Sequence, residues 1–204
     1  MMEYARKVGS PALRKLSFQQ RGLMLKALAM YLNDRKDYFY TISALTGATK
    51  ADSWVDIEGG IGNLFTYASM RRQFPDASFY VDGEAAKLSK ENTFIGHHIM
   101  VPKEGVAIHI NAFNFPVWGM LEKIAVNLFA GVPAIVKPAT ATSYLTEVVF
   151  KKETKKIENL PPTKAQQRAS KMETSGLYTT MDNTIMYLGQ AFDAWRYKSA
   201  PASE

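Results

Sequence analysis

The sequence predicts an α/β protein, in which N-terminal helices precede an incomplete parallel sheet of the Rossmann-like, doubly wound type. Two observations support this prediction. Residues 105–142 alternate between short apolar runs of strand length and a longer run of helical period, and strand–helix–strand units of this kind form parallel sheets. The residues before about position 70 keep a helical period. We therefore expect one domain over residues 1–150, and over 151–204 a charged linker with a helical tail.

The first long helix is expected to start after Ser17. This residue precedes Gln20 at the spacing of a capping box, in which the two side chains satisfy amide groups at the start of a helix. Gly47 is the expected end. Four apolar residues share one face, at helical spacing: Leu25, Leu28, Ala29 and Leu32.

The second helix is expected from near Ala51 to just before Pro75. It contains three glycines, Gly59, Gly60 and Gly62. Glycine lowers helix propensity, so we expect a neighbouring backbone to pack closely there. A phosphate-binding loop is the alternative for this GGIG stretch, but no strand precedes it.

Residues 79–100 have the mixed, short-period pattern of a β-hairpin or of connecting strands. His97 and His98 are adjacent, so in a strand their side chains point to opposite faces. No acidic residue or third histidine stands at ligand spacing nearby, and we expect no metal site.

The crossover unit begins with GVAIHI, read as a buried strand. A helix should follow, from Pro116 to Gly131, and then the strand PAIVK, stopped by Pro138, and another helix. Ligands of such sheets bind beyond the carboxyl ends of the strands. Here those ends carry the sequences NAFN and KPAT.

Asn111 and Asn114 at the first strand end have two interpretations. A rigid side-chain amide is a neutral donor that can stabilise a developing oxyanion. Alternatively, both asparagines cap the helix that starts near Pro116, since Asn is a favoured N-cap residue. Lys137, at the second strand end, could reach the ribose hydroxyls or a phosphate of a bound nucleotide.

Composition narrows the functional classes. The chain has 204 residues, 47% of them apolar, a net charge of +6 and no cysteine. The absence of cysteine excludes disulfides, thiolate metal sites and a catalytic thiol within these residues. The longest apolar run is too short and too interrupted to cross a bilayer. We expect a soluble cytoplasmic protein without a membrane or nucleic-acid partner.

The tail changes character after Phe150. A charged segment that ends in two prolines is followed by polar, basic residues. Its lysines alternate with glutamates and lack interleaved aromatics, so a solvated linker is a better interpretation than a nucleic-acid site. Residues Ile185, Leu188, Phe192 and Trp195 recur at helical spacing and predict one amphipathic helix, which either packs in a core or docks on a partner.

A resemblance to a known family covers roughly residues 5–148. The stretch INAFNFPVWGMLEKIAVNLFAGVPAIVKPATAT resembles the aldehyde dehydrogenase superfamily, whose members pair an Asn-Phe-Pro strand end with a Lys-Pro strand end. Together with HINAFNFP and the upstream helices, it looks most like the aldehyde dehydrogenase half of the bifunctional ring-opening proteins of phenylacetate degradation. These join an oxepin-CoA hydrolase to a semialdehyde dehydrogenase.

The resemblance implies that residues 1–150 are part of a cofactor-binding domain, and it implies roles for individual residues. Asn114 matches the amide of the oxyanion hole. Lys137 matches the lysine that contacts the adenosine ribose. Thr140 stands where NAD-preferring relatives often carry Glu, which implies that NADP is accepted as well as NAD. The residues Ile110, Asn111, Ala112 and Phe113 match the strand end that lines the nicotinamide cofactor.

The resemblance also implies a reaction that these residues cannot complete. Family members use a cysteine thiolate, and then a glutamate base, to oxidise the aldehyde; here the substrate would be a semialdehyde linked to coenzyme A. This chain has no cysteine, and no glycine loop of the family type follows Lys137. The first hypothesis is an N-terminal fragment, inactive by itself. The second is a non-catalytic scaffold that forms homo-oligomers or associates with a full-length relative.

Overall fold

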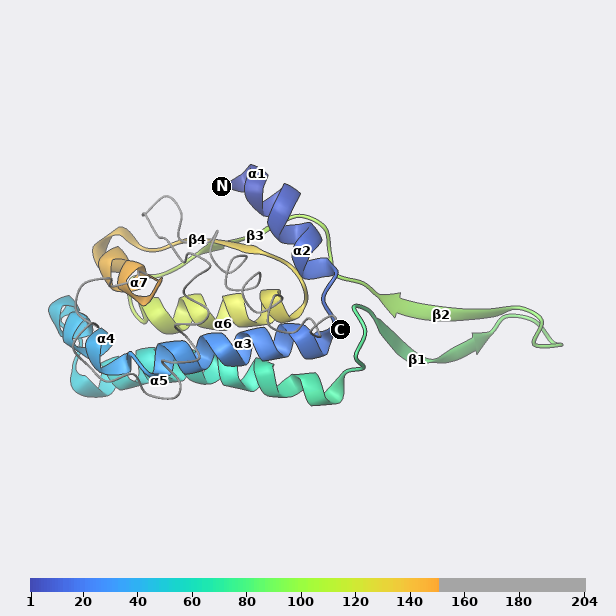
Figure 1. Ribbon diagram of the computed structural model, residues 1–204, viewed down its shortest axis with the longest axis horizontal. Coiled ribbons are helices and arrows are strands. Elements are labelled where there is room, and N and C mark those ends of the chain that lie inside the picture. Colours follow the sequence, from blue (N-terminus) through green and yellow to red (C-terminus); the bar gives the residue numbers. More distant parts are fainter. Residues whose placement is uncertain (151–204) are drawn as a thin grey trace, which may run out of the picture.

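The computed structural model describes residues 1–150, which form a helical layer, a small parallel sheet and a projecting β-hairpin (Figure 1). Three long helices contact one another in the layer: α3 (Phe18–Asn33), α5 (Lys50–Met70) and α6 (Pro116–Phe129). The shorter helices are α1 (Met2–Tyr4), α2 (Ser10–Arg14), α4 (Lys36–Ser43) and α7 (Ser143–Phe150), and a π-helix, Ala5–Gly9, joins α1 to α2.

The helix boundaries follow the signals expected from the sequence. Ser17 and Gln20 form the capping box of α3, and Gly47 has the left-handed φ of +83° that ends a helical segment. The predicted core face of α3 is buried: Leu25, Ala29 and Leu32 are completely inaccessible. Thr49 and Asp52 form a second capping box at the start of α5. The helix begins one residue before the predicted start near Ala51.

The glycines of α5 lie in the middle of that helix, so the phosphate-loop alternative is wrong. Close backbone packing is confirmed at Gly60, where an added Cβ would lie 3.0 Å from the Cα of Trp118 on α6. Gly59 faces the Trp118 ring at an ordinary contact distance, and Gly62 faces open space. One glycine of the three therefore carries the predicted close approach.

Two separate two-stranded sheets are present among the described residues. Strands β1 (Tyr80–Lys87) and β2 (Ile95–Met100) pair antiparallel, as the predicted hairpin, and project away from the helices (Figure 1). Strands β3 (Ala107–Ile110) and β4 (Ala134–Lys137) pair in parallel across α6, which confirms the crossover unit. Within residues 1–150 no third strand joins β3 and β4.

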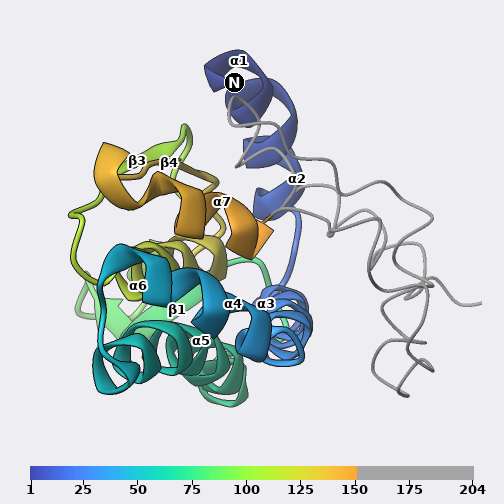
Figure 2. The ribbon, with the colours of Figure 1, turned by 90° about the vertical axis from the view of Figure 1, so that its left-hand side faces the viewer.

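The sheet covers one side of α6, and α5 covers another (Figure 2). The face of β3 that carries His109 packs against this helix, whereas Ile108 and Ile110 are 59% and 73% exposed. The expectation that β3 is a buried strand is therefore wrong for this second face. The reason is that, within residues 1–150, helices cover only one face of the sheet.

Three further expectations concern the rest of the chain, a membrane and a metal site. The predicted tail helix with Ile185, Leu188, Phe192 and Trp195 lies outside the described residues. Among residues 1–150, no helix combines the length and the apolarity needed to cross a bilayer. In the same range, no three His, Cys, Asp or Glu side chains lie close enough together to hold a metal ion.

Candidate functional site at the carboxyl ends of β3 and β4

The two predicted strand ends lie side by side. Ile110 is paired with Lys137 in the parallel register, and the N–H of Asn111 donates to the carbonyl oxygen of Lys137 over 3.0 Å. Beyond this bond the chain leaves β3 in a short turn of residues 111–115 and leaves β4 at Pro138. The structure therefore brings NAFN and KPAT to one edge of the sheet.

The 111–115 turn presents most of its side chains to solvent. Ala112, Phe113 and Asn114 are exposed, with Phe113 at 66%. Thr142 holds the middle of the turn, because its hydroxyl donates to the carbonyl oxygen of Phe113 over 3.1 Å. Asn114 thus offers an accessible side-chain amide on a turn that is tied to both β4 and the residues before α7.

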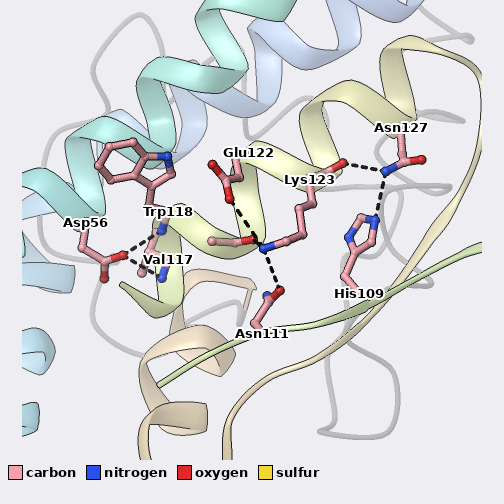
Figure 3. A network of polar contacts seen from close by, with 9 residues as sticks. Asp56, His109, Asn111, Val117, Trp118, Glu122, Lys123 and Asn127 are labelled. Carbon is pink, nitrogen blue, oxygen red and sulfur yellow. Dashed lines mark hydrogen bonds and ion pairs between the residues drawn. The ribbon is translucent and has the colours of Figure 1, made fainter. Parts of the chain in front are cut away.

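Asn111 is different, because its side chain points inward and is only 7% exposed. Its Oδ1 accepts a hydrogen bond from Nζ of Lys123 on α6 over 3.3 Å (Figure 3). The same Nζ donates to the carbonyl oxygen of Gly119 over 2.6 Å and lies 3.5 Å from a carboxylate oxygen of Glu122. Asn111 can therefore offer a ligand its backbone, while its side chain ties β3 to α6.

The helix-cap interpretation of the two asparagines is wrong. The N-cap of α6 is Phe115, in a left-handed conformation with φ of +53°, and no side chain at that position caps the helix. The acceptor comes from α5: Oδ1 of Asp56 receives the amides of Val117 and Trp118 over 3.0 and 2.7 Å (Figure 3). Asn114 is therefore not used as a helix cap.

Asp56 is an unusual acceptor because it is buried, with 3% of its surface exposed. Burial raises the pKa of this carboxyl group to about 6, and the two amide hydrogen bonds oppose the rise. Near neutral pH the carboxylate form predominates, and its negative charge lies at the positive end of the α6 dipole.

A second polar pair, of the buried His109 and the half-buried Asn127, lies at the other end of this region. Nδ2 of Asn127 on α6 donates to the carbonyl oxygen of Lys123 over 2.8 Å and lies 2.9 Å from Nε2 of His109 (Figure 3). Because an amide nitrogen only donates, Nε2 is the acceptor, and the neutral ring carries its proton on Nδ1. Burial, and then the charge of Lys123, lower the pKa of His109.

Lys137 and Thr140 complete the edge. Both are exposed, and within residues 1–150 Nζ of Lys137 makes a single hydrogen bond, over a long 3.4 Å, to the carbonyl oxygen of Pro138. Thr140 begins a single 3₁₀ turn, Thr140–Thr142, that leads into α7. A cation, a neutral amide and an aromatic ring thus line one edge of the sheet, which suits a ligand with hydroxyl or phosphate groups.

Three residues whose hydrogen bonds support this edge were not predicted from the sequence: Asp56, Lys123 and Asn127. One signal was available for Asp56. It lies at helical spacing within the buried stripe of α5, where its neighbours are Ser53, Ile57, Gly60, Ile61 and Leu64. A carboxylate among core positions needs a partner, and that partner could have been sought at the start of a neighbouring helix.

Comparison with known proteins agrees with this geometry. Residues 1–165 match the model of the aldehyde dehydrogenase family. Over 147 residues the chain is 38% identical to a 3,4-dehydroadipyl-CoA semialdehyde dehydrogenase of Aromatoleum evansii, an alignment that covers 72% of this chain and 28% of the relative. The chain thus spans less than a third of the length of that curated relative.

Two solved structures show the same fold. Proline utilization A (PutA) from Bdellovibrio bacteriovorus, inactivated by N-propargylglycine, matches with a TM-score of 0.58 at 18% identity, over 72% of this chain and 14% of that one. Glyceraldehyde-3-phosphate dehydrogenase GapN from Methanocaldococcus jannaschii, complexed with NADP, matches with a TM-score of 0.57 at 17% identity, over 86% and 33%. By the extent of the family match and the arrangement of its paired strand ends, the chain belongs to the aldehyde dehydrogenase family.

Proposed function

We propose that this chain supplies the first part of the nicotinamide-cofactor domain of a dehydrogenase for CoA-linked semialdehydes. The observation that carries the proposal is the single sheet edge on which the exposed turn with Asn114 lies beside Lys137. The 38% identity to a 3,4-dehydroadipyl-CoA semialdehyde dehydrogenase supports the choice of substrate class. The GapN neighbour complexed with NADP supports a nicotinamide cofactor.

The exposed groups at this edge fit such a cofactor. The ammonium group of Lys137 is a donor suited to ribose hydroxyls, and Phe113 offers an accessible ring beside the backbone of Ile110, Asn111 and Ala112. Thr140 is neutral, so it would not repel a 2′-phosphate, and both NADP and NAD are accepted in this proposal. When bound, the cofactor supplies the hydride acceptor of the reaction.

Asn114 is assigned to the oxyanion hole. Its exposed amide would donate to the oxygen on which negative charge develops when a nucleophile attacks the aldehyde carbon. Loss of one such donor typically lowers a rate about a hundred- to a thousandfold. In this role the neighbouring anchors of the turn matter, because a donor contributes only when it is already in place.

The nucleophile itself is not among these residues. The family reaction starts with attack by a cysteine thiolate, and the 204 residues contain no cysteine. We therefore propose that the chain on its own does not oxidise aldehydes. In this proposal residues 1–150 are one domain, which holds only part of the reaction centre, and residues 151–204 are a separate segment.

Cofactor titration of the purified chain tests the binding part of this proposal. We expect NADPH to bind, and Lys137→Met to weaken the binding about tenfold, the effect of losing about 1.4 kcal/mol. Lys103→Met is the matched control, since Lys103 is also an exposed lysine but lies in the loop before β3. Equal affinities for the Lys137 variant and the unmodified chain would refute the assigned site.

An activity assay tests the catalytic part. The pure chain, given an aldehyde and NADP, should produce no NADPH absorbance. Aldehyde-dependent formation of NADPH that persists after repeated purification would show that inactivity was wrongly proposed.

The projecting hairpin supports a second candidate, a non-catalytic role in association with a further copy or with a full-length relative. Five of its large apolar side chains are more than half exposed: Leu88, Phe94, Ile95, Ile99 and Met100. Isolated two-stranded hairpins are marginally stable in water, and exposed apolar surface of this kind marks interaction sites. The arm would gain stability by packing against another chain.

Sedimentation velocity tests this association. We expect Ile99→Lys to shift the chain toward monomer, whereas Ala85→Lys, which adds the same charge at another exposed position of the arm, should leave the distribution unchanged. This role would be ruled out if the unmodified chain stayed monomeric at every concentration and did not co-purify with an intact relative.

A further inference from the structure

The first turn of α6 is held by a carboxylate from another helix. Oδ1 of Asp56 on α5 accepts the amides of both Val117 and Trp118, at 3.0 and 2.7 Å, although these residues are 61 and 62 positions away in the sequence (Figure 3). Carboxylates at helix N-termini satisfy amide groups and interact favourably with the helix dipole. Asp56 acts here as a cap that does not belong to the capped helix.

The amides of residues 116–119, the first turn of α6, are accounted for by this arrangement. Pro116 has no N–H, Val117 and Trp118 donate to Asp56, and Gly119 donates to the carbonyl oxygen of Phe115 over 2.9 Å. Phe115, the N-cap residue, contributes no side-chain acceptor. The hydrogen bonds to Asp56 therefore fix the position of the first turn of α6.

The contact is also close in space. Beside Asp56 on α5, Gly60 lets the backbone of Trp118 approach so far that an added Cβ would lie 3.0 Å from its Cα. The first turn of α6 is thus fixed both by hydrogen bonds and by direct packing. Such a double constraint leaves little freedom for the residues that lead into the helix.

The 111–115 turn has three anchors as a result. Asn111 is bonded to Lys137 of β4 at its start, and Thr142 holds Phe113 in its middle. At its end the turn runs into the amides that Asp56 binds. Only Asn114, between the second and third anchors, presents an exposed amide.

We propose that Asp56 is a positioning residue for Asn114: by holding the amides of Val117 and Trp118, it fixes the end of the 111–115 turn and thereby the direction of the Asn114 amide. This inference rests on the proposed function in that Asn114 belongs to the oxyanion hole. A consequence is that the positive end of α6 is already neutralised, so this helix terminus is not available to bind a phosphate group.

Amide hydrogen exchange and NMR of the purified chain test the proposal without any cofactor. In Asp56→Ala we expect exchange at least about tenfold faster at Asn111, Val117, Trp118 and Gly119 than in Thr49→Ala. That control removes a comparable cap from the start of α5 itself. The side-chain amide signal of Asn114, identified by its loss in Asn114→Asp, should shift or broaden in Asp56→Ala alone.

Asp56→Asn keeps an acceptor oxygen without the charge, so it should shift the Asn114 signal less than Asp56→Ala does, by about as much as protonation of Asp56. If Asp56→Ala does not fold, this variant decides the question, because the Asn114 signal should shift in it together with faster exchange at Val117 and Trp118. Faster exchange confined to Val117 and Trp118, with an unchanged Asn114 signal, would overturn the proposal and leave Asp56 as a local cap.

A pH series gives a readout that a purely structural cap would not move. The Asn114 side-chain signal should change as Asp56 becomes protonated, and the change should be absent in Asp56→Asn. A pH-independent Asn114 signal in the unmodified chain would count against coupling between the two residues. None of these measurements involves cofactor, so a failure to bind NADPH refutes the proposed function and leaves this inference standing.

Discussion

Gly60 on α5 lies directly against the backbone of Trp118 on α6: a Cβ at position 60 would be 3.0 Å from the Trp118 Cα and 3.2 Å from its N. Helices usually meet through side chains at axial separations of 8–10 Å. Here one helix meets the other through a bare backbone, at the turn of α6 that follows the candidate site. Close packing is therefore required immediately beside the residues of the candidate site.

Gly60→Ala should therefore destabilise the protein although alanine favours helices. We expect a loss of about 1–3 kcal/mol in the free energy of unfolding, the usual cost of forcing an extra group into a packed contact. Urea denaturation monitored by circular dichroism measures it. Gly62→Ala, on the same helix but facing open space, should instead stabilise by about 0.5–1 kcal/mol through helix propensity. Equal effects at the two positions would refute the close contact.

The stability of the protein should depend on pH through Asp56. Burial raises its pKa from 3.8 to about 6, so between these values the folded state binds more protons than the unfolded state. The contribution of Asp56 to stability is then greatest below about pH 4 and is lost as the pH rises through about 6, by about 3 kcal/mol at most. Denaturation of the unmodified chain and of Asp56→Asn at several pH values measures this contribution as a difference.

The comparison with Asp56→Asn is needed because His109 acts in the opposite direction. Its pKa is lowered by burial, so its contribution makes the protein more stable as the pH rises through the ordinary range of histidine. Subtracting the two pH profiles removes this shared contribution. A difference that does not change between about pH 4 and pH 8 would contradict the raised pKa of Asp56.

His109 should be neutral at pH 7, with its proton on Nδ1. This follows from Nε2 accepting the amide hydrogen of Asn127, and long-range ¹H–¹⁵N spectra of the imidazole distinguish the two tautomers. In Asn127→Leu, which removes the donor, we expect the pKa of His109 to rise, because the neutral ring loses its hydrogen bond. The signals are assigned by their loss in His109→Gln, and a ring protonated on Nε2 would contradict the arrangement.

Local signals in the sequence predicted most of the fold. The capping box at Ser17, the stop at Gly47 and the strand–helix–strand pattern around Pro116 each depend on residues close together in the chain, and each is confirmed. The exposure of Ile108 and Ile110 was not predicted. An apolar strand does not reveal whether one or both of its faces are covered within a given stretch of chain.

The support of the candidate site could not be predicted by the same rules. By their spacing, Asn111 and Asn114 are equivalent candidates for a helix cap. In the structure Asn111 is buried and accepts a hydrogen bond from Lys123, whereas Asn114 is exposed. The cap comes from Asp56. This choice depends on how α5 crosses α6, a contact between residues more than 60 positions apart. Sequence spacing carries no information about such a contact.

Thr140 provides a test of cofactor preference. If the ribose of the cofactor lies near Lys137, a carboxylate at position 140 would repel a 2′-phosphate, as like charges in close proximity do. We expect Thr140→Glu to weaken NADP binding at least about tenfold, or about 1.4 kcal/mol, and to leave NAD binding almost unchanged. Isothermal titration with both cofactors measures the two affinities. Ala85→Glu adds the same charge on the exposed hairpin and should change neither. An equal loss for NAD and NADP in Thr140→Glu would place the 2′-position away from Thr140, because only one of the two cofactors carries the additional charge.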